Sequence, residues 1–364
     1  MNPKGTKFMR ISLTNNLLLT ILFAAFAAIN LWGCGDSVTQ PPPPPPGPGP
    51  MLFVANDGSG TGYLSGIDLD SSNSVRQGVA GLGRVPNSII RQGDKVFVLN
   101  SNSQDINILQ LSDSNLVRSI DTVDVSFGGA RSPAYAALAA TGDIYISNFD
   151  DNSVAILKTS TLTISHIIPN VGNGPQGVLA HGDKVYVCIS GYHNDELIDS
   201  SGSVAVISTV SKEVIYHIPV GVNPQFLIED NSGIVHVVCT GTYGDDNGEI
   251  YKFSARADTI TQVINIGGYP GDIAISGSFA YLANWGDANN GFLYRYEITT
   301  GRILNSPSSP ILVSTGASRI VARADGSIFV SCWQADKVDE VVGTTRRRSW
   351  SAGDGPGPMF IFEH

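Results

Sequence analysis

Charged residues are scarce in this sequence, where Asp, Glu, Lys and Arg make up 15% of 364 residues. Histidine occurs six times and cysteine four times, and no C-x-x-C pair or Cys/His grouping has the spacing of a zinc site. The G-x-S-x-G, H-E-x-x-H and EF-hand patterns are missing as well. These absences argue against a serine hydrolase, a zinc protease and an EF-hand protein.

Helical periodicity is also lacking beyond residue 35, whereas glycine is abundant at 40 copies. Short alternating apolar runs between Gly and Pro turns take its place, as expected of an all-β chain. The clearest stretch is 170–190, NVGNGPQGVLAHGDKVYVCIS, where a Gly- and Pro-rich turn precedes an apolar run, a polar turn and an alternating strand. Related stretches recur along the chain.

Two series of residues show this repeat in one phase, with steps of 41 to 50 residues between the aromatic positions. The middle of one strand in each repeat holds an aromatic residue or His, at Phe53, Phe97, Tyr145, Tyr186, His236, Tyr281 and Phe329. The strand before it opens with Pro, at Pro86, Pro133, Pro175, Pro224, Pro270 and Pro358, with Ser318 in place of one Pro. Such periods with four short strands each are typical of propeller blades.

We therefore predict that residues 51–364 form an all-β, seven-bladed β-propeller with four-stranded antiparallel blades. Residue 51 begins inside a blade, and the last segment, 353–362, is an opening strand with nothing after it. The C-terminal strand is accordingly predicted to pair with the N-terminal blade and close the ring, which removes exposed strand edges.

Several repeats end a strand with an aromatic residue, an aliphatic residue, any residue and Asn, as in FVAN at 53–56, FVLN at 97–100, YISN at 145–148 and YLAN at 281–284. This pattern resembles the YVTN-type repeat of seven-bladed propeller proteins, in which a Gly-x-x-Pro turn and a strand come before it. The resemblance implies the same fold over residues 51–364. It does not specify a function, because propellers serve in binding, scaffolding and hydrolysis.

The N-terminus has the order of a bacterial export signal, and its basic residues are Lys4, Lys7 and Arg10. Residues 17–29 form an apolar run that is too short for a membrane span. The next segment, Leu-Trp-Gly-Cys at 31–34, resembles the lipobox of bacterial lipoproteins. The resemblance implies that residues 1–33 are a signal peptide and that Cys34 carries a lipid. An ordinary signal peptide and an uncleaved anchor are the alternatives.

Residues 34–50 are predicted to be a linker, because the PPPPPPGPGP run at 41–50 favours extended polyproline structure. At about 3.1 Å per residue, it would hold the propeller roughly 30 Å from the lipid. We expect a lipid-anchored protein of the bacterial cell envelope, in the periplasm or at the cell surface.

The chain after the signal peptide is acidic, with 19 Lys and Arg against 32 Asp and Glu, a net charge of −13. A field of that sign disfavours nucleic acid and anionic headgroups as partners. Apart from Cys34, the cysteines are Cys188, Cys239 and Cys332. Their odd number leaves at least one thiol free or paired with another chain, and we expect buried thiols within strands.

The predicted topology places the Gly/Pro turns and the loops after the second strands on one face, around the channel. Aromatic residues in this region could stack on a planar or ring-shaped ligand. The candidate ligand-binding aromatics are Phe149, Tyr192, Tyr243, Trp285 and Trp333. Packing between blades is the competing interpretation.

Two arginines are further candidates, because Arg84 and Arg131 each lie two residues before an opening Pro in adjacent blades. We predict that they lie close together at the channel mouth, where they could hold a carboxylate or phosphate. A salt bridge between blades is the alternative. Arg319 directly follows Ser318 and is expected to point elsewhere.

Clustered acidic residues give weak candidates for a Ca²⁺ site, namely Asp245, Asp246, Asn247 and Glu249. A second acidic cluster contains Asp195, Glu196 and Asp199, with His193 nearby. Solvated turns are the preferred interpretation of both clusters. No other cofactor is predicted.

The main functional hypothesis is a membrane-tethered, extracytoplasmic binding protein that captures a small molecule or a protein partner at the channel mouth. The first alternative is a lactonase-like hydrolase, which by resemblance would use His, Glu and Arg in the channel. The second is a structural or adhesion module of the envelope. Corrinoid-capturing surface lipoproteins belong to the same general group of propellers, but no residue here specifies a corrinoid. We expect a monomer that is not an enzyme.

Overall fold

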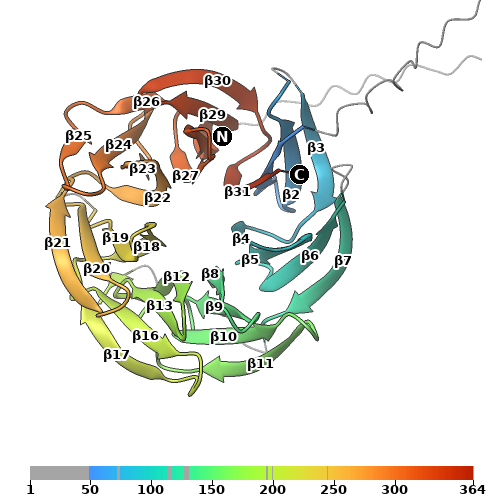
Figure 1. The fold of residues 1–364 in the computed structure, drawn as a ribbon. Coiled ribbons are helices and arrows are strands. Elements are labelled where there is room, and N and C mark those ends of the chain that lie inside the picture. The colour runs from blue at the N-terminus through green and yellow to red at the C-terminus, as the bar shows by residue number, and fades with distance from the viewer. Residues whose placement is uncertain are drawn as a thin grey trace, which may run out of the picture. The chain divides into compact units, whose positions relative to one another are not determined.

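The structure is a computed structural model that describes residues 49–363 except 72–73, 113–116, 127–130, 194–195, 199 and 244. Seven antiparallel sheets stand in a ring around a common axis, as Figure 1 shows. No α-helix occurs among the described residues, and none of their helical segments could cross a membrane. The predicted signal peptide, Cys34 and most of the predicted linker lie outside the described residues.

We number the sheets as blades in chain order and name the strands of each blade from the axis outward. Blade 1 contains β31 (Pro356–Phe362), β1 (Met51–Asn56), β2 (Tyr63–Asp68) and β3 (Val75–Gly81). Blade 2 contains β4 (Pro86–Gln92), β5 (Lys95–Asn100), β6 (Asp105–Leu111) and β7 (Val117–Asp124). Blade 3 contains β8 (Pro133–Leu138), β9 (Ile144–Asn148), β10 (Ser153–Lys158) and β11 (Thr163–Ile168).

Blades 4 to 7 follow the same plan. Blade 4 contains β12 (Pro175–His181), β13 (Lys184–Ile189), β16 (Ser203–Ser208) and β17 (Val214–Pro219), and blade 5 contains β18 (Pro224–Glu229), β19 (Ile234–Cys239), β20 (Glu249–Ser254) and β21 (Thr259–Asn265). Blade 6 contains β22 (Pro270–Ser276), β23 (Phe279–Asn284) and β24 (Gly291–Glu297), and both β25 (Ile303–Asn305) and β26 (Ile311–Val313) pair with β24. Blade 7 contains β27 (Ala317–Ala322), β28 (Ser327–Cys332), β29 (Lys337–Val342) and β30 (Thr345–Ser351). The seven-bladed, four-stranded architecture is confirmed.

Ring closure takes place in blade 1, where the C-terminal β31 pairs with β1. The antiparallel register runs from Met51 opposite Phe362 to Val54 opposite Met359. The rings of Phe53 and Phe360 stack with their centroids 5.0 Å apart. In Figure 1 the red β31 accordingly lies beside the blue strands, and the predicted closure is confirmed.

The apolar core lies between the blades. Seven clusters of buried apolar side chains occur among the described residues, and each joins two neighbouring blades. The repeated aromatic or His of every second strand is at most 3% exposed. This repeated position therefore builds the packing between blades.

His236 is the polar member of that series, and it is enclosed by a network of hydrogen bonds. Its Nδ1 lies 2.5 Å from the hydroxyl of Tyr296, and its Nε2 lies 3.2 Å from Oδ2 of Asp230. Burial lowers the pKa of His236 to about 4, although hydrogen bonding to Asp230 acts in the opposite direction. His236 thus takes a structural place in the interface between blades 5 and 6.

The register of the opening strands corrects two predicted positions. Pro86, Pro133 and Pro270 pair with the Asn that ends the second strand of their own blade. In blade 7 the paired residue is Ala317, opposite Cys332, and in blade 1 it is Pro356, opposite Asn56. Ser318 and Pro358 therefore do not occupy the Pro position. Counting by sequence shifted them because Ala replaces Pro in blade 7, and the last segment holds two Pro residues.

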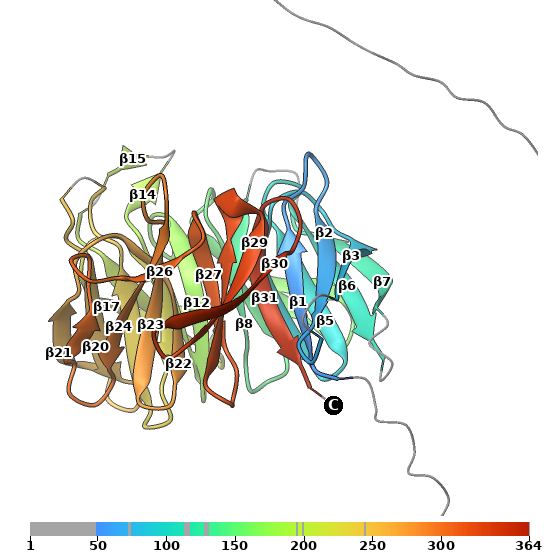
Figure 2. The same ribbon diagram turned by 90° about the horizontal axis from the view of Figure 1, so that it is seen from above.

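The turns between blades and the loops after the second strands share one face of the ring, because each opening strand begins where its partner strand ends. A small hairpin of β14 (Tyr192–His193) and β15 (Glu196–Leu197) extends the loop of blade 4. Figure 2 shows this hairpin projecting beyond one face of the ring. We call this face the mouth of the channel.

Candidate functional site

The wall of the channel is formed by the position two residues after the start of each opening strand. A register irregularity follows the first residue of each of these strands, and it turns the next side chains toward the axis. The residues at this position are Ser88, Tyr135, Gly177, Phe226, Asp272, Arg319 and Pro358. All except Gly177 line one central cavity of about 130 Å³.

Arg319 lies at the centre of the channel, although it was expected to point elsewhere. Its guanidinium carbon lies 5.0 Å from the ring centroid of Tyr135 and 4.8 Å from that of Phe226. Its Nη2 donates hydrogen bonds to the backbone oxygen and Oδ1 of Asn87. No carboxylate oxygen of a described residue lies within 4.0 Å of this guanidinium. Arg319 therefore presents a positive charge that no direct ion pair neutralises.

Asp272 is the acidic residue of the channel wall. Its Oδ1 and Oδ2 accept hydrogen bonds from the backbone N–H groups of Ile273 and Ile320, at 2.8 and 3.1 Å. Burial raises the pKa of Asp272 to about 6, while Arg319 and the two N–H groups act in the opposite direction. A carboxyl group with this pKa changes charge close to neutral pH and moderates the field around Arg319.

Two cavities open above Arg319 at the mouth, and Trp285, Ser318 and Arg319 line both of them. The first, of about 280 Å³, is completed by Asp57, Val85, Pro86, Asn87, Trp333, Gly355, Gly357 and Pro358. The second, of about 300 Å³, is completed by Tyr135, Gln225, Phe226, Thr240, Tyr243, Tyr269, Gly271, Ala283 and Ala317. Each volume suits a small molecule or one part of a larger ligand.

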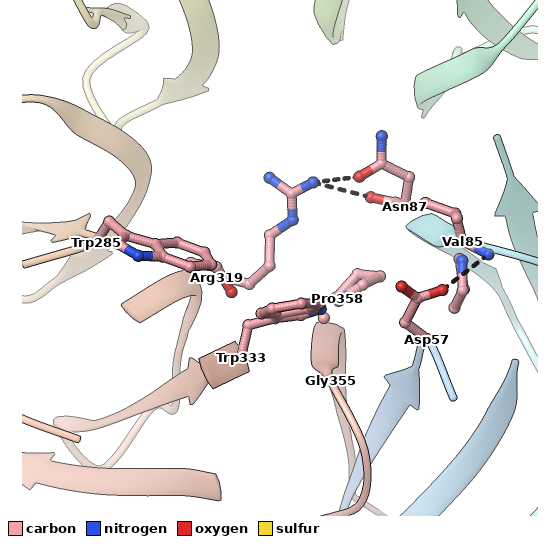
Figure 3. A pocket seen from close by; sticks show the side chains of 11 residues that line it. Asp57, Val85, Asn87, Trp285, Arg319, Trp333, Gly355 and Pro358 are labelled. Atoms are coloured by element: carbon pink, nitrogen blue, oxygen red, sulfur yellow. Dashed lines mark hydrogen bonds between the residues drawn. The ribbon is translucent and has the colours of Figure 1, made fainter. Parts of the chain in front are cut away.

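Two tryptophans border the first cavity with their side chains partly open to solvent. Trp285 is 47% exposed and Trp333 is 43% exposed, and their ring centroids lie 5.8 Å apart. Gly355 has φ +62°, and a Cβ there would lie 2.7 Å from Nε1 of Trp333. Glycine thus allows the backbone to pass directly against this indole. Figure 3 shows both indoles and Arg319 together, with Asp57 across the cavity.

Tyrosines continue the aromatic surface around the mouth. Tyr243 is 66% exposed, and its ring centroid lies 6.4 Å from that of Tyr192 and 6.1 Å from that of Tyr269. Tyr243 and Tyr269 line the second cavity, whereas Tyr192 does not. The prediction missed Tyr269 because it lies in a turn between blades rather than in a loop after a second strand.

The remaining predicted residues lie outside these two cavities. Arg84 is exposed, and Arg131 forms an ion pair with Asp151. The predicted pair of arginines is therefore not the charged group of the two cavities. Asp151 lies between β9 and β10 of blade 3, the blade that follows Arg131, so this ion pair is not the predicted salt bridge between blades. Phe149 is half-buried and packs near Gly174.

The predicted Ca²⁺ residues do not form an acidic cage. The hydroxyl of Thr242 donates a hydrogen bond to Oδ2 of Asp245, and the backbone N–H of Thr242 donates one to Oδ1 of Asn247. No group of three or more His, Cys, Asp or Glu side chains able to hold a metal occurs in the described part of the chain. Asp195, Asp199 and the side chain of His193 lie outside that part. The Ca²⁺ site stays a prediction.

The three cysteines of the propeller are buried and unpaired. Cys188, Cys239 and Cys332 form no disulfide. Burial raises the pKa of all three thiols, which keeps them protonated. They act as small apolar side chains in the layers between blades, as expected.

No protein-family model matches the chain, and no curated protein sequence matches it either. Solved structures do share its fold. The periplasmic gluconolactonase of Pseudomonas aeruginosa superposes with a TM-score of 0.65 at 14% identity, over 86% of this chain and 99% of that chain. A putative 6-phosphogluconolactonase of Bacteroides uniformis superposes with a TM-score of 0.66 at 11% identity, over 86% and 99% of the two chains. The hydrazine synthase structure of Kuenenia stuttgartiensis gives 0.64 at 13% identity, over 85% and 99%. At such identities the likeness extends to the fold alone.

Proposed function

We propose that this protein is an extracytoplasmic binding protein that captures a small anionic molecule at the mouth of its propeller channel. One observation carries the proposal: the guanidinium of Arg319 lies beneath two open cavities, without a carboxylate partner among the described residues. Its fork of N–H donors suits the oxygens of a carboxylate or a phosphate. The partly exposed indoles of Trp285 and Trp333 offer an apolar surface to the rest of the ligand.

Binding is favoured over catalysis by the residues that line the two mouth cavities. They include neither the His nor the Glu that a lactonase-like mechanism would use by resemblance. A lactonase remains the second candidate, because gluconolactonases share the fold and Asp272 has a pKa near 6 inside the channel. Such a carboxyl could serve as a general base at neutral pH.

The location belongs to the same proposal. The basic N-terminus, the apolar run and the lipobox-like segment ending at Cys34 support export and lipidation. The likeness to a periplasmic propeller agrees with an extracytoplasmic place. The repeat is proposed to be of the YVTN type, because four strand ends match that pattern. Substitution of Cys34 by Ser should abolish incorporation of labelled fatty acid and release the protein from membranes.

Intrinsic tryptophan fluorescence and calorimetry test the binding function. We expect small carboxylates and sugar phosphates to bind, and Arg319→Gln to weaken them at least tenfold, since a charged hydrogen bond contributes about 1.5–3 kcal/mol. Arg84→Gln, which removes an exposed arginine outside the two cavities, is the matched control. Equal affinity of the Arg319 variant and the wild type would refute the proposal. Hydrolysis of gluconolactone, lost in Asp272→Asn, would support the lactonase instead.

A further inference from the structure

We propose that the ligand of the first mouth cavity is a zwitterion with a carboxylate at one end and an alkylated ammonium group at the other. This inference rests on the proposed function, because it uses Arg319 for the carboxylate. It adds a cation subsite made of Asp57 and Trp333, and Trp285 continues the aromatic wall beside Trp333. The cavity of about 280 Å³ joins the two subsites in one space.

Asp57 supplies the negative charge of the cation subsite. Its Oδ1 accepts a hydrogen bond from the backbone N–H of Val85 at 3.2 Å, which fixes the carboxylate at the edge of the cavity. Among the described residues, Oδ2 has no hydrogen-bond donor, and no Lys, Arg or His lies within ion-pair distance. Figure 3 shows Asp57 and Arg319 on different sides of the same space. The cavity therefore carries one charge of each sign that has no direct ion pair among the described residues.

The indole of Trp333 gives the subsite its second means of holding a cation, and Trp285 lies beside it with the ring centroids 5.8 Å apart. The faces of tryptophan rings attract cations, and the attraction grows as the cation loses its hydration shell. Asp57 and Trp333 both pack against Gly355, where a Cβ would lie 3.2 Å from Cβ of Asp57 and 2.7 Å from Nε1 of Trp333. The positive φ at Gly355 thus brings a carboxylate and an indole to one point of the wall.

The apolar lining favours an alkylated ammonium over a primary one. Val85, Pro86, Pro358 and two glycines form much of the wall. A primary ammonium brings three N–H donors that need acceptors, and the side chains here offer few besides Asp57. An unpaired donor would lose its hydration without replacement. Methyl groups on the nitrogen remove those donors and contact the aliphatic wall and the indole faces.

Three molecules of nearly equal shape separate the contributions of the two ends. Glycine betaine carries both charges, 3,3-dimethylbutanoate replaces its nitrogen with carbon, and choline replaces its carboxylate with a hydroxymethyl group. We expect glycine betaine to bind about tenfold more tightly than either isostere, by calorimetry at low ionic strength and by tryptophan fluorescence. A longer betaine with three methylene groups between the charges tests the separation of the subsites.

Variants assign each end to its residue. Asp57→Asn keeps the oxygen that accepts from Val85, and it should narrow the gap in affinity between betaine and 3,3-dimethylbutanoate, because the indoles alone then hold the cation. The affinity for 3,3-dimethylbutanoate should not fall. Arg319→Gln should weaken binding of all three carboxylates and leave binding of choline unchanged. Asp354→Asn removes an exposed carboxylate on the same face that accepts a hydrogen bond from Ser59 outside the cavity, and it should change nothing. Thermal melts establish that each variant is folded.

The binding results distinguish a failure of the cation subsite from a failure of the proposed anion-binding function. If 3,3-dimethylbutanoate binds as tightly as both betaines, the cation subsite is refuted while anion binding at Arg319 stands. If choline binds and none of the three carboxylates does, the proposed function fails as well. Absence of binding by all four molecules, with a sugar phosphate bound through Arg319, would also overturn the zwitterion and retain the anion site.

Discussion

The layers between blades and the wall of the channel are built from the same repeated unit, but they differ in what repeats. Between the blades, six of the seven middle positions are aromatic and the seventh is His236, and all are at most 3% exposed. Along the channel, the equivalent positions hold seven different residues, including Arg319 and Asp272. The recurring position has one packing task in every blade. The variable position faces the channel, where its contacts differ from blade to blade, so it is free to differ.

The largest expected effect comes from removing the strand that closes the ring. Deletion of residues 358–364 takes away most of β31, leaves β1 with an unpaired edge and removes Phe360 from its stack on Phe53. We expect loss of the cooperative thermal transition, or a fall in Tm of more than about 10 °C, since several buried side chains lose their partners. An unchanged Tm in calorimetry would show that closure contributes little.

A single substitution in the layer between blades should have the next largest effect. Phe97 is fully buried in the cluster shared by blades 2 and 3. Phe97→Ala should lower the free energy of unfolding by about 3–5 kcal/mol in urea titrations. Ser88→Ala, at the wall position of the same blade, is the control and should change it by less than about 1 kcal/mol. Equal losses in the two variants would contradict the division between packing layer and channel wall.

The buried His236 gives its interface a dependence on pH. Burial lowers the pKa of His236 from its ordinary value of 6.5 to about 4, so the folded state binds the proton less well than the unfolded state. The free energy of unfolding therefore has its full value above pH 6.5. It decreases as the pH drops from 6.5 toward 4, by a total on the order of 1–3 kcal/mol.

Replacing the polar pair tests this origin of the pH dependence. His236→Phe combined with Tyr296→Phe removes the titrating ring and also the hydroxyl that would otherwise lose its partner. Phe is a suitable replacement for His236 because other blades hold Phe at the equivalent position. Urea titrations at pH 4.5 and 7 should then differ less in the double variant than in the wild type. The same pH difference in both proteins would assign the effect to other groups.

The fold could be predicted because the residues that determine it recur in every blade. The site could be predicted only in part because each of its residues occurs once. Seven copies of the aromatic position gave the blade count and the closure. Trp285, Trp333 and Tyr243 were found because they follow second strands, whose ends were marked by the repeat. Arg319 was missed because Ala317 replaces the opening Pro. An offset of one residue turns a strand side chain to the opposite face.

The smallest expected effect on stability comes from replacing Arg319, which tests most directly the difference between the packing layers and the channel wall. Its contacts are two ring faces and Asn87, and it has no ion pair with a described carboxylate. Arg319→Gln should therefore change the free energy of unfolding by about 1 kcal/mol for the lost ring and Asn87 contacts, well below the loss expected for Phe97→Ala. The same variant should lose most of its anion binding, whereas Phe97→Ala at a temperature where it remains folded should retain it. Denaturation and titration of the two variants, side by side, test this separation. A loss of several kcal/mol in the Arg319 variant would mean that the arginine supports the ring rather than a ligand.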